Sequence, residues 1–372
     1  MKHLYFIVFF LSFQFIKAQN ITTDEWTKFV PSVSIPKNIK CRKSNNNVDL
    51  IQFNGKYYCA FRTAPTHFAS KKVHLYIISS TDFKNWKFET EFFVKADMRE
   101  PRFCIFQNKL HFYFFEGGYN IFKFEPKHIW TSILADSGWS EKIQTNLDGF
   151  VDWRFHEHDN KMYLSAYYGV NLYNSQHHAN LRLFTSEDGI NFQPISKEPQ
   201  ITEKGAEEGE FVFDKQGNVW SLVRLEGSGS LLCFASKDSI DKWKTKFSKF
   251  KYDSSLLFEQ GDDLCLIARR HLKGEATPVQ NPSKKQRRKN LLRYSFSKKV
   301  TALYKINKEK MEIETLMDFP STGDTAFPAI APIDSNSFYV LNYSSDIHKR
   351  SRIWFGGQLA KTYIYQTVLH FK

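Results

Sequence analysis

One stretch of the sequence carries charged side chains at both of its ends. In EEGEFVFDKQGNVWSLVRLEG, residues 207–227, apolar residues alternate on either side of a turn-forming DKQGN segment. This pattern predicts a β-hairpin. Folding the hairpin brings Glu208, Glu210, Arg224 and Glu226 to its open end. Carboxyl groups can transfer protons there, and a guanidinium can bind a carboxylate or a sulfate.

The same hairpin plan recurs along the chain, which predicts a repeat architecture. The copies begin at intervals of 45 to 72 residues, marked by Asp49, Glu100, Asp152, Glu208, Asp253 and Thr325. Several hairpins are followed by a third apolar segment, such as LRLFTSEDGINF. These segments resemble degraded Asp-boxes, the turns between outer strands of sialidase-like propellers. We therefore expect an all-β fold, a single sialidase-like β-propeller with six blades, or five if the last repeat only closes the ring. Either residues 26–35 or the C-terminal TYIYQTVLHF would complete the open blade.

In a propeller the inner strand of each blade descends from the upper rim and the second strand returns to it. The rim therefore collects residues that start the first strand or end the second. This rule predicts a set of substrate-binding residues, namely Arg62, Arg102, Arg154, Arg224, Arg269, Arg270, His271, Asp49, Glu100, Asp152 and Glu210. Arg62, Arg224 and Arg269 each end the second strand of their copy, so we expect them to converge on the central funnel. There they either bind an anion or pair with acids of the rim.

One chemistry open to such a rim is β-elimination on a uronic acid. A base removes the proton next to the carboxylate, and His67, Tyr168 or His271 is suited to that role. An acid protonates the departing oxygen, for which Tyr167 or Glu208 is suited. Arginines neutralise the carboxylate as negative charge develops. We predict His67, Tyr168, Tyr167 and Glu208 as the catalytic residues.

A second chemistry is exo-acting glycoside hydrolysis, which needs one protonated and one ionised carboxyl group. The acids at the strand starts supply candidates for such a pair, namely Asp49, Glu100, Asp152, Glu208 and Glu210. A third alternative is a propeller that binds glycans without catalysis, since arginine and aromatic side chains suffice for binding.

The sequence predicts neither a metal site nor a cofactor. The HEHD motif at residues 156–159 has the residue types of a metal cluster, but it aligns with the lower turns of the other copies. The five cysteines show no paired spacing, and four lie in apolar runs, which is typical of buried free thiols.

The N-terminus indicates export. Residues 1–18 have a basic start, an apolar stretch and a plausible cleavage site after Ala18, as in a secretory signal peptide. We expect a periplasmic or secreted monomer in which residues 19–372 form one domain, with no membrane span. Its formal charge of +13 favours an acidic or sulfated oligosaccharide as partner, and export argues against nucleic acid.

The longest interval between copies contains a polar insertion at residues 271–299, which we place between the second and third strands of the fifth blade. Its cluster of basic residues is either a solvated surface or a contact with anionic substrate.

Several stretches together give the chain a family resemblance, namely DMREPRF, APTHFASKK, GAEEGEFVFDKQGNVWSLVRLEG and STGDTAFPAI. From about Asn47 onward the chain resembles an exported propeller family of polysaccharide-degrading bacteria, and in particular the oligosaccharide dehydratases that act on ulvan. The resemblance implies a substrate, ulvan fragments with a terminal uronic acid beside sulfated rhamnose. It also implies a reaction, loss of water to give an unsaturated uronate, but it assigns no catalytic residue.

Overall fold

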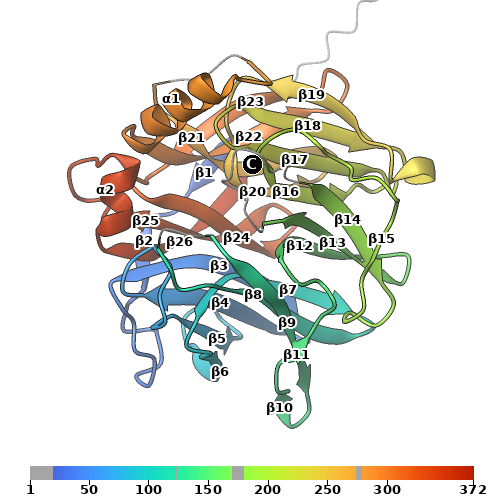
Figure 1. Cartoon of the computed structure of the whole chain (residues 1–372). Coiled ribbons are helices and arrows are strands. Elements are labelled where there is room, and N and C mark those ends of the chain that lie inside the picture. The colour runs from blue at the N-terminus through green and yellow to red at the C-terminus, as the bar shows by residue number, and fades with distance from the viewer. Residues whose placement is uncertain (1–19, 122–123, 170–179, 274–278) are drawn as a thin grey trace, which may run out of the picture.

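The computed structural model describes residues 20–121, 124–169, 180–273 and 279–372. Six antiparallel sheets are arranged radially around one axis (Figure 1), which confirms the six-bladed propeller. The predicted signal peptide lies outside the described residues. None of the helices in the described ranges is long and apolar enough to cross a bilayer.

Each blade is a meander in which the strand nearest the axis comes first. The first blade consists of β3 (Ser44–Phe53), β4 (Lys56–Ala64), β5 (His74–Ser80) and β6 (Lys87–Phe92). The second consists of β7 (Asp97–Phe106), β8 (Lys109–Gly117) and β9 (Pro126–Ala135), with β10 (Gly138–Trp139) and β11 (Ile143–Gln144) both on β9. The third consists of β12 (Phe150–His158), β13 (Lys161–Tyr168), β14 (Leu181–Ser186) and β15 (Gln193–Pro194).

The fourth blade consists of β16 (Ala206–Phe213), β17 (Val219–Leu225), β18 (Ser230–Ala235) and β19 (Lys244–Ser248), with a 3₁₀ turn at Lys237–Ser239. The fifth consists of β20 (Asp253–Gln260), β21 (Asp263–His271), β22 (Lys299–Asn307) and β23 (Glu312–Phe319). The sixth consists of β24 (Thr325–Asp334), β25 (Ser337–Ser345) and β26 (Thr362–Phe371), completed by β1 (Ile21–Thr23) and β2 (Thr27–Val30).

The ring closes in the sixth blade, and both predicted closing segments take part. The C-terminal strand β26 pairs with β25 on one side and with the N-terminal strands β1 and β2 on the other. The two ends of the described part of the chain are therefore held in one sheet, which leaves no open edge between the first and last repeats.

Aromatic side chains fill the space between blades and block the axis. The Tyr113 ring of β8 stacks on Phe155 of β12 at a centroid distance of 3.9 Å. Trp153 and Phe327, on the inner strands of the third and sixth blades, meet with centroids 5.5 Å apart. Because these two blades face each other across the ring, the contact closes the channel and leaves a blind depression above it.

Every inner strand contains a β-bulge near its upper end. The register shifts where β3, β7, β12, β16, β20 and β24 pair with their second strands. At the bulges of β3, β7, β16, β20 and β24 one residue adopts φ near +50°, for example Glu100 (50°), Glu208 (51°) and Ser254 (49°). A bulge re-aims the side chains beside it, so the six bulges form the upper rim of the funnel.

Two insertions rise beside that rim. Helix α1 (Lys284–Ser295) lies between β21 and β22, as predicted for the polar insertion, and α2 (Trp354–Leu359) lies between β25 and β26. The five cysteines are unpaired as predicted; four are buried and Cys41 is half-buried.

The predicted Asp-box-like turns are present at the ends of β5 and β14. Asp82 Oδ1 accepts hydrogen bonds from the backbone N–H groups of Lys84 and Asn85, and Asp188 does the same for Ile190 and Asn191. These aspartates stabilise outer turns, away from the funnel.

Candidate functional site

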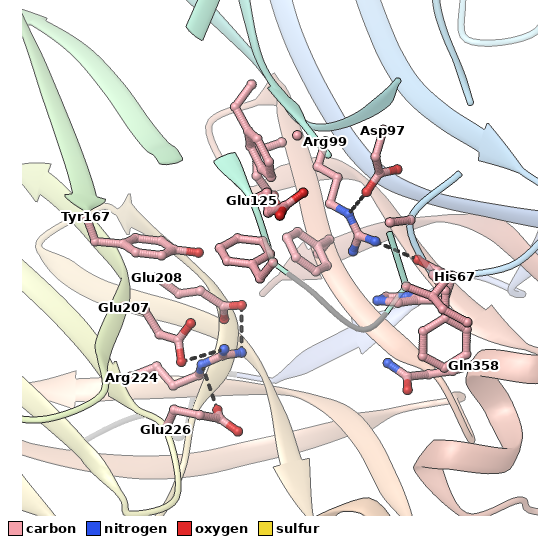
Figure 2. Close-up of a pocket in the computed structure, with 18 of the residues that line it drawn as sticks. His67, Asp97, Arg99, Glu125, Tyr167, Glu207, Glu208, Arg224, Glu226 and Gln358 are labelled. Carbon is pink, nitrogen blue, oxygen red and sulfur yellow. Dashed lines mark hydrogen bonds and ion pairs between the residues drawn. The ribbon is translucent and has the colours of Figure 1, made fainter. Parts of the chain in front are cut away.

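A cavity of about 350 Å³ opens at the upper end of the propeller axis (Figure 2). This volume lies at the lower end of the range for small-molecule sites, about 300–1,000 Å³, so it suits one sugar residue. Six residues of the predicted site line it, namely His67, Glu100, Tyr167, Glu208, Arg224 and Arg269. In Figure 2, His67 and Arg99 lie on one side, while Tyr167, Glu207, Glu208 and Arg224 lie on the other.

The first wall contains a histidine held by a buried carboxylate. His67 Nδ1 lies 2.7 Å from Asp324 Oδ2, and the two side chains are 14% and 0% exposed. Asp324 also accepts a hydrogen bond from the Tyr343 hydroxyl at 3.0 Å. Burial alone would raise the pKa of Asp324, but the contacts with His67, Arg269 and Tyr343 keep it below its usual value.

An ionised carboxylate can only accept hydrogen bonds, so we assign the proton of His67 to Nδ1. The amide nitrogen of Asn46 is more distant from the same ring atom, at 3.3 Å. Burial lowers the pKa of His67, and Arg99 and Arg62 oppose the positive charge further, despite the attraction of Asp324. The imidazole is therefore neutral near pH 7 and has an unprotonated Nε2.

Arg99 supports the histidine loop from the second blade. Its Nε lies 2.6 Å from Asp97 Oδ2, and its Nη2 donates to the carbonyl of His67 at 2.9 Å. His67 and its neighbour Arg99 therefore keep fixed positions on this wall.

The second wall is a cluster of carboxyl groups around one guanidinium. Arg224, on β17, lies 2.6 Å from Glu208, 3.0 Å from Glu207 and 3.3 Å from Glu226. Burial and the neighbouring carboxylates, against the attraction of Arg224, raise the pKa of Glu207 to about 7. For Glu226, Lys251 and Arg224 outweigh burial and lower the pKa. The wall thus combines a carboxyl group that is half-protonated near neutrality with one that stays ionised.

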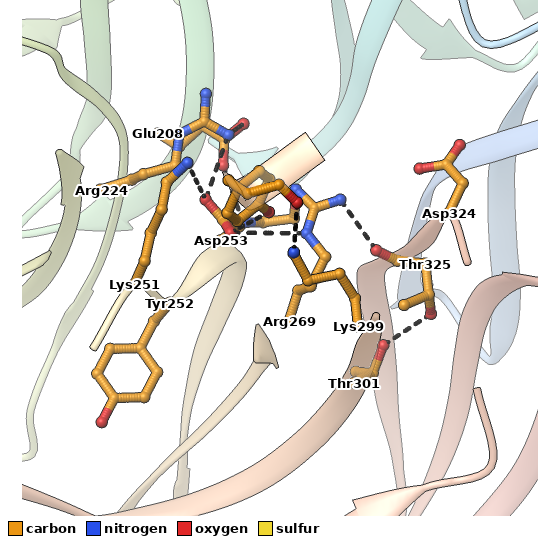
Figure 3. A network of polar contacts seen from close by, with 12 residues as sticks. Glu208, Arg224, Lys251, Tyr252, Asp253, Arg269, Lys299, Thr301, Asp324 and Thr325 are labelled. Atoms are coloured by element: carbon orange, nitrogen blue, oxygen red, sulfur yellow. Dashed lines mark hydrogen bonds and ion pairs between the residues drawn. The ribbon is translucent and has the colours of Figure 1, made fainter. Parts of the chain in front are cut away.

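A buried ionic network supports this wall from below (Figure 3). Asp253 lies 3.3 Å from the Lys251 ammonium and 3.6 Å from the guanidiniums of Arg224 and Arg269. It also accepts a short hydrogen bond from the Tyr294 hydroxyl. Because three cations converge on it, Asp253 has a lowered pKa in spite of its burial.

The lining is not a purely basic funnel. Among the described residues, six acids line the cavity, namely Asp97, Glu100, Glu125, Glu207, Glu208 and Glu226, against the cations Arg99, Arg224, Lys251 and Arg269. Burial raises the pKa of Glu100 to about 7, as it does for Glu207. With both protonated, the acids and cations balance. Pairing of rim arginines with rim acids, one of the two predicted alternatives, is therefore what the structure contains.

Six predicted binding residues lie beneath the cavity instead of lining it, namely Arg62, Arg102, Arg154, Asp49, Asp152 and Glu210. For Asp49, Arg102, Arg154 and Glu210, which follow the bulge of their inner strand, the reason is that bulge. In β3 the bulge is at Asn47, so Asp49 lies two residues further down and accepts from the backbone N–H of Phe103 at 2.7 Å. The expectation that these residues share the rim is therefore corrected.

The buried arginines of this group have internal partners. Arg62 is fully buried and lies 2.7 Å from Asp97. Arg154 Nε lies 2.9 Å from both carboxylate oxygens of Glu210. Arg102 Nε donates to the Trp153 carbonyl at 2.6 Å. A buried cation needs such compensation, and these partners offset the cost of burying the three arginines.

Asp152 shares that burial, but no side-chain hydrogen bond reaches it from the described residues. Burial and nearby Glu100 raise its pKa well above the usual value, which favours the neutral form of this carboxyl group.

Three further predicted residues lie away from this lining. Arg270 forms a bidentate pair with Asp318 on an outer strand, at 2.7 and 2.6 Å, and lines a second cavity together with His271. Strand alternation explains this, because Arg269 points to the axis and its neighbour points to the opposite face. Tyr168 packs edge-on against Phe150 and is not among the residues that line the axial cavity, whereas Tyr167 is.

Several cavity residues escaped the sequence analysis, namely Arg99, Glu125, Glu207, Lys251, Tyr294, Trp354 and Gln358, together with Asp324 behind His67. Glu207 and Asp324 directly precede two repeat markers, so a wider window at each strand start would have found them. Tyr294 and Trp354 belong to insertions that have no repeat signal.

The HEHD motif lies at the lower end of the third blade, as predicted. His156 Nε2 lies 2.8 Å from the Phe211 carbonyl, and His158 stacks on Phe213. In the described part of the chain, no three His, Cys, Asp or Glu side chains are grouped so that they could hold a metal ion.

Comparison with known proteins shows the fold and nothing narrower. No family model matches the chain, and no curated protein matches it. A structure of a protein of unknown function from Dyadobacter fermentans DSM 18053 aligns with TM-score 0.65 and 12% identity, over 95% of this chain and 99% of that one.

Trypanosoma rangeli sialidase has the same fold. Its complex with sialic acid aligns with TM-score 0.62 and 10% identity, over 94% of this chain and 58% of the sialidase. Its complex with the inhibitor DANA gives TM-score 0.58 and 11% identity, over 88% and 55%. The chain thus spans little more than half of the sialidase, and at these identities it is similar to it as a six-bladed propeller.

Proposed function

We propose that this chain is an exported, monomeric carbohydrate-active enzyme that removes water by β-elimination from the terminal uronic acid of acidic, ulvan-derived oligosaccharides. The observation that carries the proposal is the His67–Asp324 pair, which presents a neutral imidazole to a cavity the size of one sugar. Such a group is a general base near neutral pH.

In the proposed reaction, His67 Nε2 takes the proton from the ring carbon next to the carboxylate. The electron pair left behind forms the new carbon–carbon double bond as the bond to the neighbouring hydroxyl breaks. That hydroxyl leaves as water after it accepts a proton from Tyr167 on the opposite wall, or from Glu208 when that carboxyl group is protonated. The carboxylate carries the developing charge and needs a cation beside it, and Arg99 or Arg224 is within the lining for this purpose.

Two carboxyl groups of raised pKa allow the cavity to accommodate an acidic substrate. When Glu100 and Glu207 are protonated, the described residues of the lining carry equal numbers of ionised acids and cations, so a bound uronate adds a single negative charge to them. Binding an anion there favours protonation of these two groups. Acid sites of raised pKa beside arginines can therefore accommodate a sugar acid.

Exo-acting glycoside hydrolysis is the second candidate, and the Arg224 wall favours it. Hydrolysis uses one protonated and one ionised carboxyl group. Glu207, with a pKa of about 7, and Glu226, with a lowered pKa, meet that requirement on one guanidinium. The sialidase with the same fold is in complex with sialic acid, itself an acidic sugar. Glycan binding without catalysis is the third candidate.

One assay separates the three. The protein is incubated with uronate-terminated ulvan fragments while mid-ultraviolet absorbance and new reducing ends are followed. We expect absorbance to rise without new reducing ends. A rise in both would indicate chain cleavage by a lyase, reducing ends alone would indicate a hydrolase, and no change over a panel of fragments would leave only binding.

A further inference from the structure

Helix α1 belongs to the most basic part of the chain. Residues 276–308 contain ten lysines and arginines and no acid. The helix itself has no acidic residue in its first turn, although the positive end of the helix dipole lies there. Lys284 and Lys285 occupy that turn. The missing acid and the two lysines both make the helix less stable. The stability of the helix therefore does not explain its positive charge.

The inner face of α1 is anchored to the propeller. Asn290 Nδ2 donates to the carbonyl of Gly227 at 2.9 Å, and the Tyr294 hydroxyl donates to Asp253. A Cβ at Gly227 would come within 2.5 Å of the Arg287 side chain, so helix and rim are in close contact there. The helix is therefore held in one orientation beside the cavity.

The outer face carries a basic stripe, which consists of Lys284, Lys285, Arg288, Lys289 and Arg293 and includes the exposed Leu292 among them. All five are exposed. Their spacing of four residues forms two adjacent rows, Lys284 with Arg288 and Lys285 with Lys289 and Arg293, and together the rows span about 14 Å of the helix at 1.5 Å per residue. Among the described residues, none of the five has an acidic side chain within ion-pair distance, and rows of like charge are unfavourable on a helix.

Tyr294, on the inner face of the helix, places α1 beside the cavity. It lies one residue beyond Arg293, lines the axial cavity and is buried between the ammonium groups of Lys251 and Lys299, at 3.9 and 3.8 Å from its ring. A chain whose end occupies the cavity can therefore continue over the rim along α1.

We infer that the basic stripe of α1 is a docking surface for the polymeric part of a sulfated, uronate-bearing polysaccharide whose terminal residue occupies the axial cavity. The identity of the polymer rests on the proposed function, whereas the polyanion surface rests on the helix alone. Each cation that meets a sulfate or carboxylate releases a counterion, so binding depends strongly on salt.

The test is the affinity of the protein for ulvan chains, measured by calorimetry over a series of salt concentrations. The triple variant Lys285→Gln/Lys289→Gln/Arg293→Gln keeps good helix formers and removes like-charge pairs, so the fold should persist. We expect at least a tenfold loss of affinity and a fall of about two in the slope of log K against log salt. A uronate-terminated disaccharide should lose less than twofold, because it does not reach the helix.

The matched control is Lys56→Gln/Lys109→Gln/Lys161→Gln, which removes three exposed lysines from the lower turns of the first three blades. Its affinity for ulvan should stay within twofold of the wild type. Equal losses in both triple variants would overturn the inference, and so would tighter binding of the wild type to vesicles of anionic lipid than to ulvan. The disaccharide elimination assay reports the proposed function separately, so either can fail alone.

Discussion

The two walls of the axial cavity differ in how buried charged groups are paired. On one wall, His67 has a single carboxylate partner, Asp324, and the pair has a defined tautomer. On the other, Arg224 is surrounded by Glu207, Glu208 and Glu226. The first wall contains one base with a predictable proton position. The second contains several acids whose protonation depends on one another.

This difference separates the tasks of the walls. A single imidazole that is neutral and held in place suits abstraction of a proton, because the base must be unprotonated and correctly positioned. A carboxyl cluster on a guanidinium suits charge balance and proton donation, since it can gain or lose a proton with little movement. Four predictions test the comparison, beginning with the largest effect.

Replacement of the base should have the largest consequence. His67→Gln removes the group that accepts the proton, and we expect kcat on a uronate-terminated fragment to fall about 10³-fold. Asp324→Asn should cause a comparable loss, because an amide no longer holds the proton on Nδ1. The measurement is the initial rate of absorbance increase at saturating substrate.

A matched histidine is available as the control. His74 on β5 also contacts a carboxylate, Glu91, but it lies on an outer strand. His74→Gln should keep kcat within twofold. If both histidine variants retained full activity, His67 would not be the base.

Loss of the central guanidinium should mainly affect stability. Arg224→Met leaves buried carboxylates without their cation, which typically costs about 3–5 kcal/mol. Arg270→Met breaks an exposed pair with Asp318 and should cost at most about 1 kcal/mol. Urea denaturation measures both. Similar midpoints for the two variants would show that the Arg224 cluster is not what holds this wall.

Two adjacent tyrosines test the predicted proton donor. Tyr167 lines the cavity and Tyr168 packs on Phe150. Tyr167→Phe should lower kcat about 10²-fold, the lower end of the range for acid–base catalysis, since Glu208 remains. Tyr168→Phe should have a much smaller effect. The reverse order would restore Tyr168 as a catalytic residue.

The smallest effect concerns pH. The pKa of Glu207 is raised to about 7, so its neutral form is lost as pH rises through that value, and KM for a uronate should then increase several-fold. Since the pKa of His67 is lowered, kcat should fall only at pH below the usual value of about 6.5. Glu207→Gln should flatten the rise in KM. Glu100, the other carboxyl group with a pKa of about 7, is tested in the same way with Glu100→Gln. If KM rose with pH in both variants as it does in the wild type, neither carboxyl group would cause the rise.

Much of the fold could be predicted because it rests on local patterns. Alternation around turn residues identified each hairpin, and the rule for strand starts and ends located His67, Tyr167, Glu208, Arg224 and Arg269 at the cavity. The same rule failed for Asp49 and Arg270. Bulges shift the register of the inner strands, and a difference of one residue changes the face of a strand.

The sequence by itself determined that six like hairpins form a ring and which of their ends carry charge, because turn chemistry and period-two alternation act over a few residues. Only the tertiary structure decided which charges reach the cavity and how they are protonated. His67 meets Asp324, and Asp253 meets Tyr294 from an insertion outside the repeats. Such pairs join distant parts of the chain, and their burial shifts each pKa by an amount that no local pattern contains.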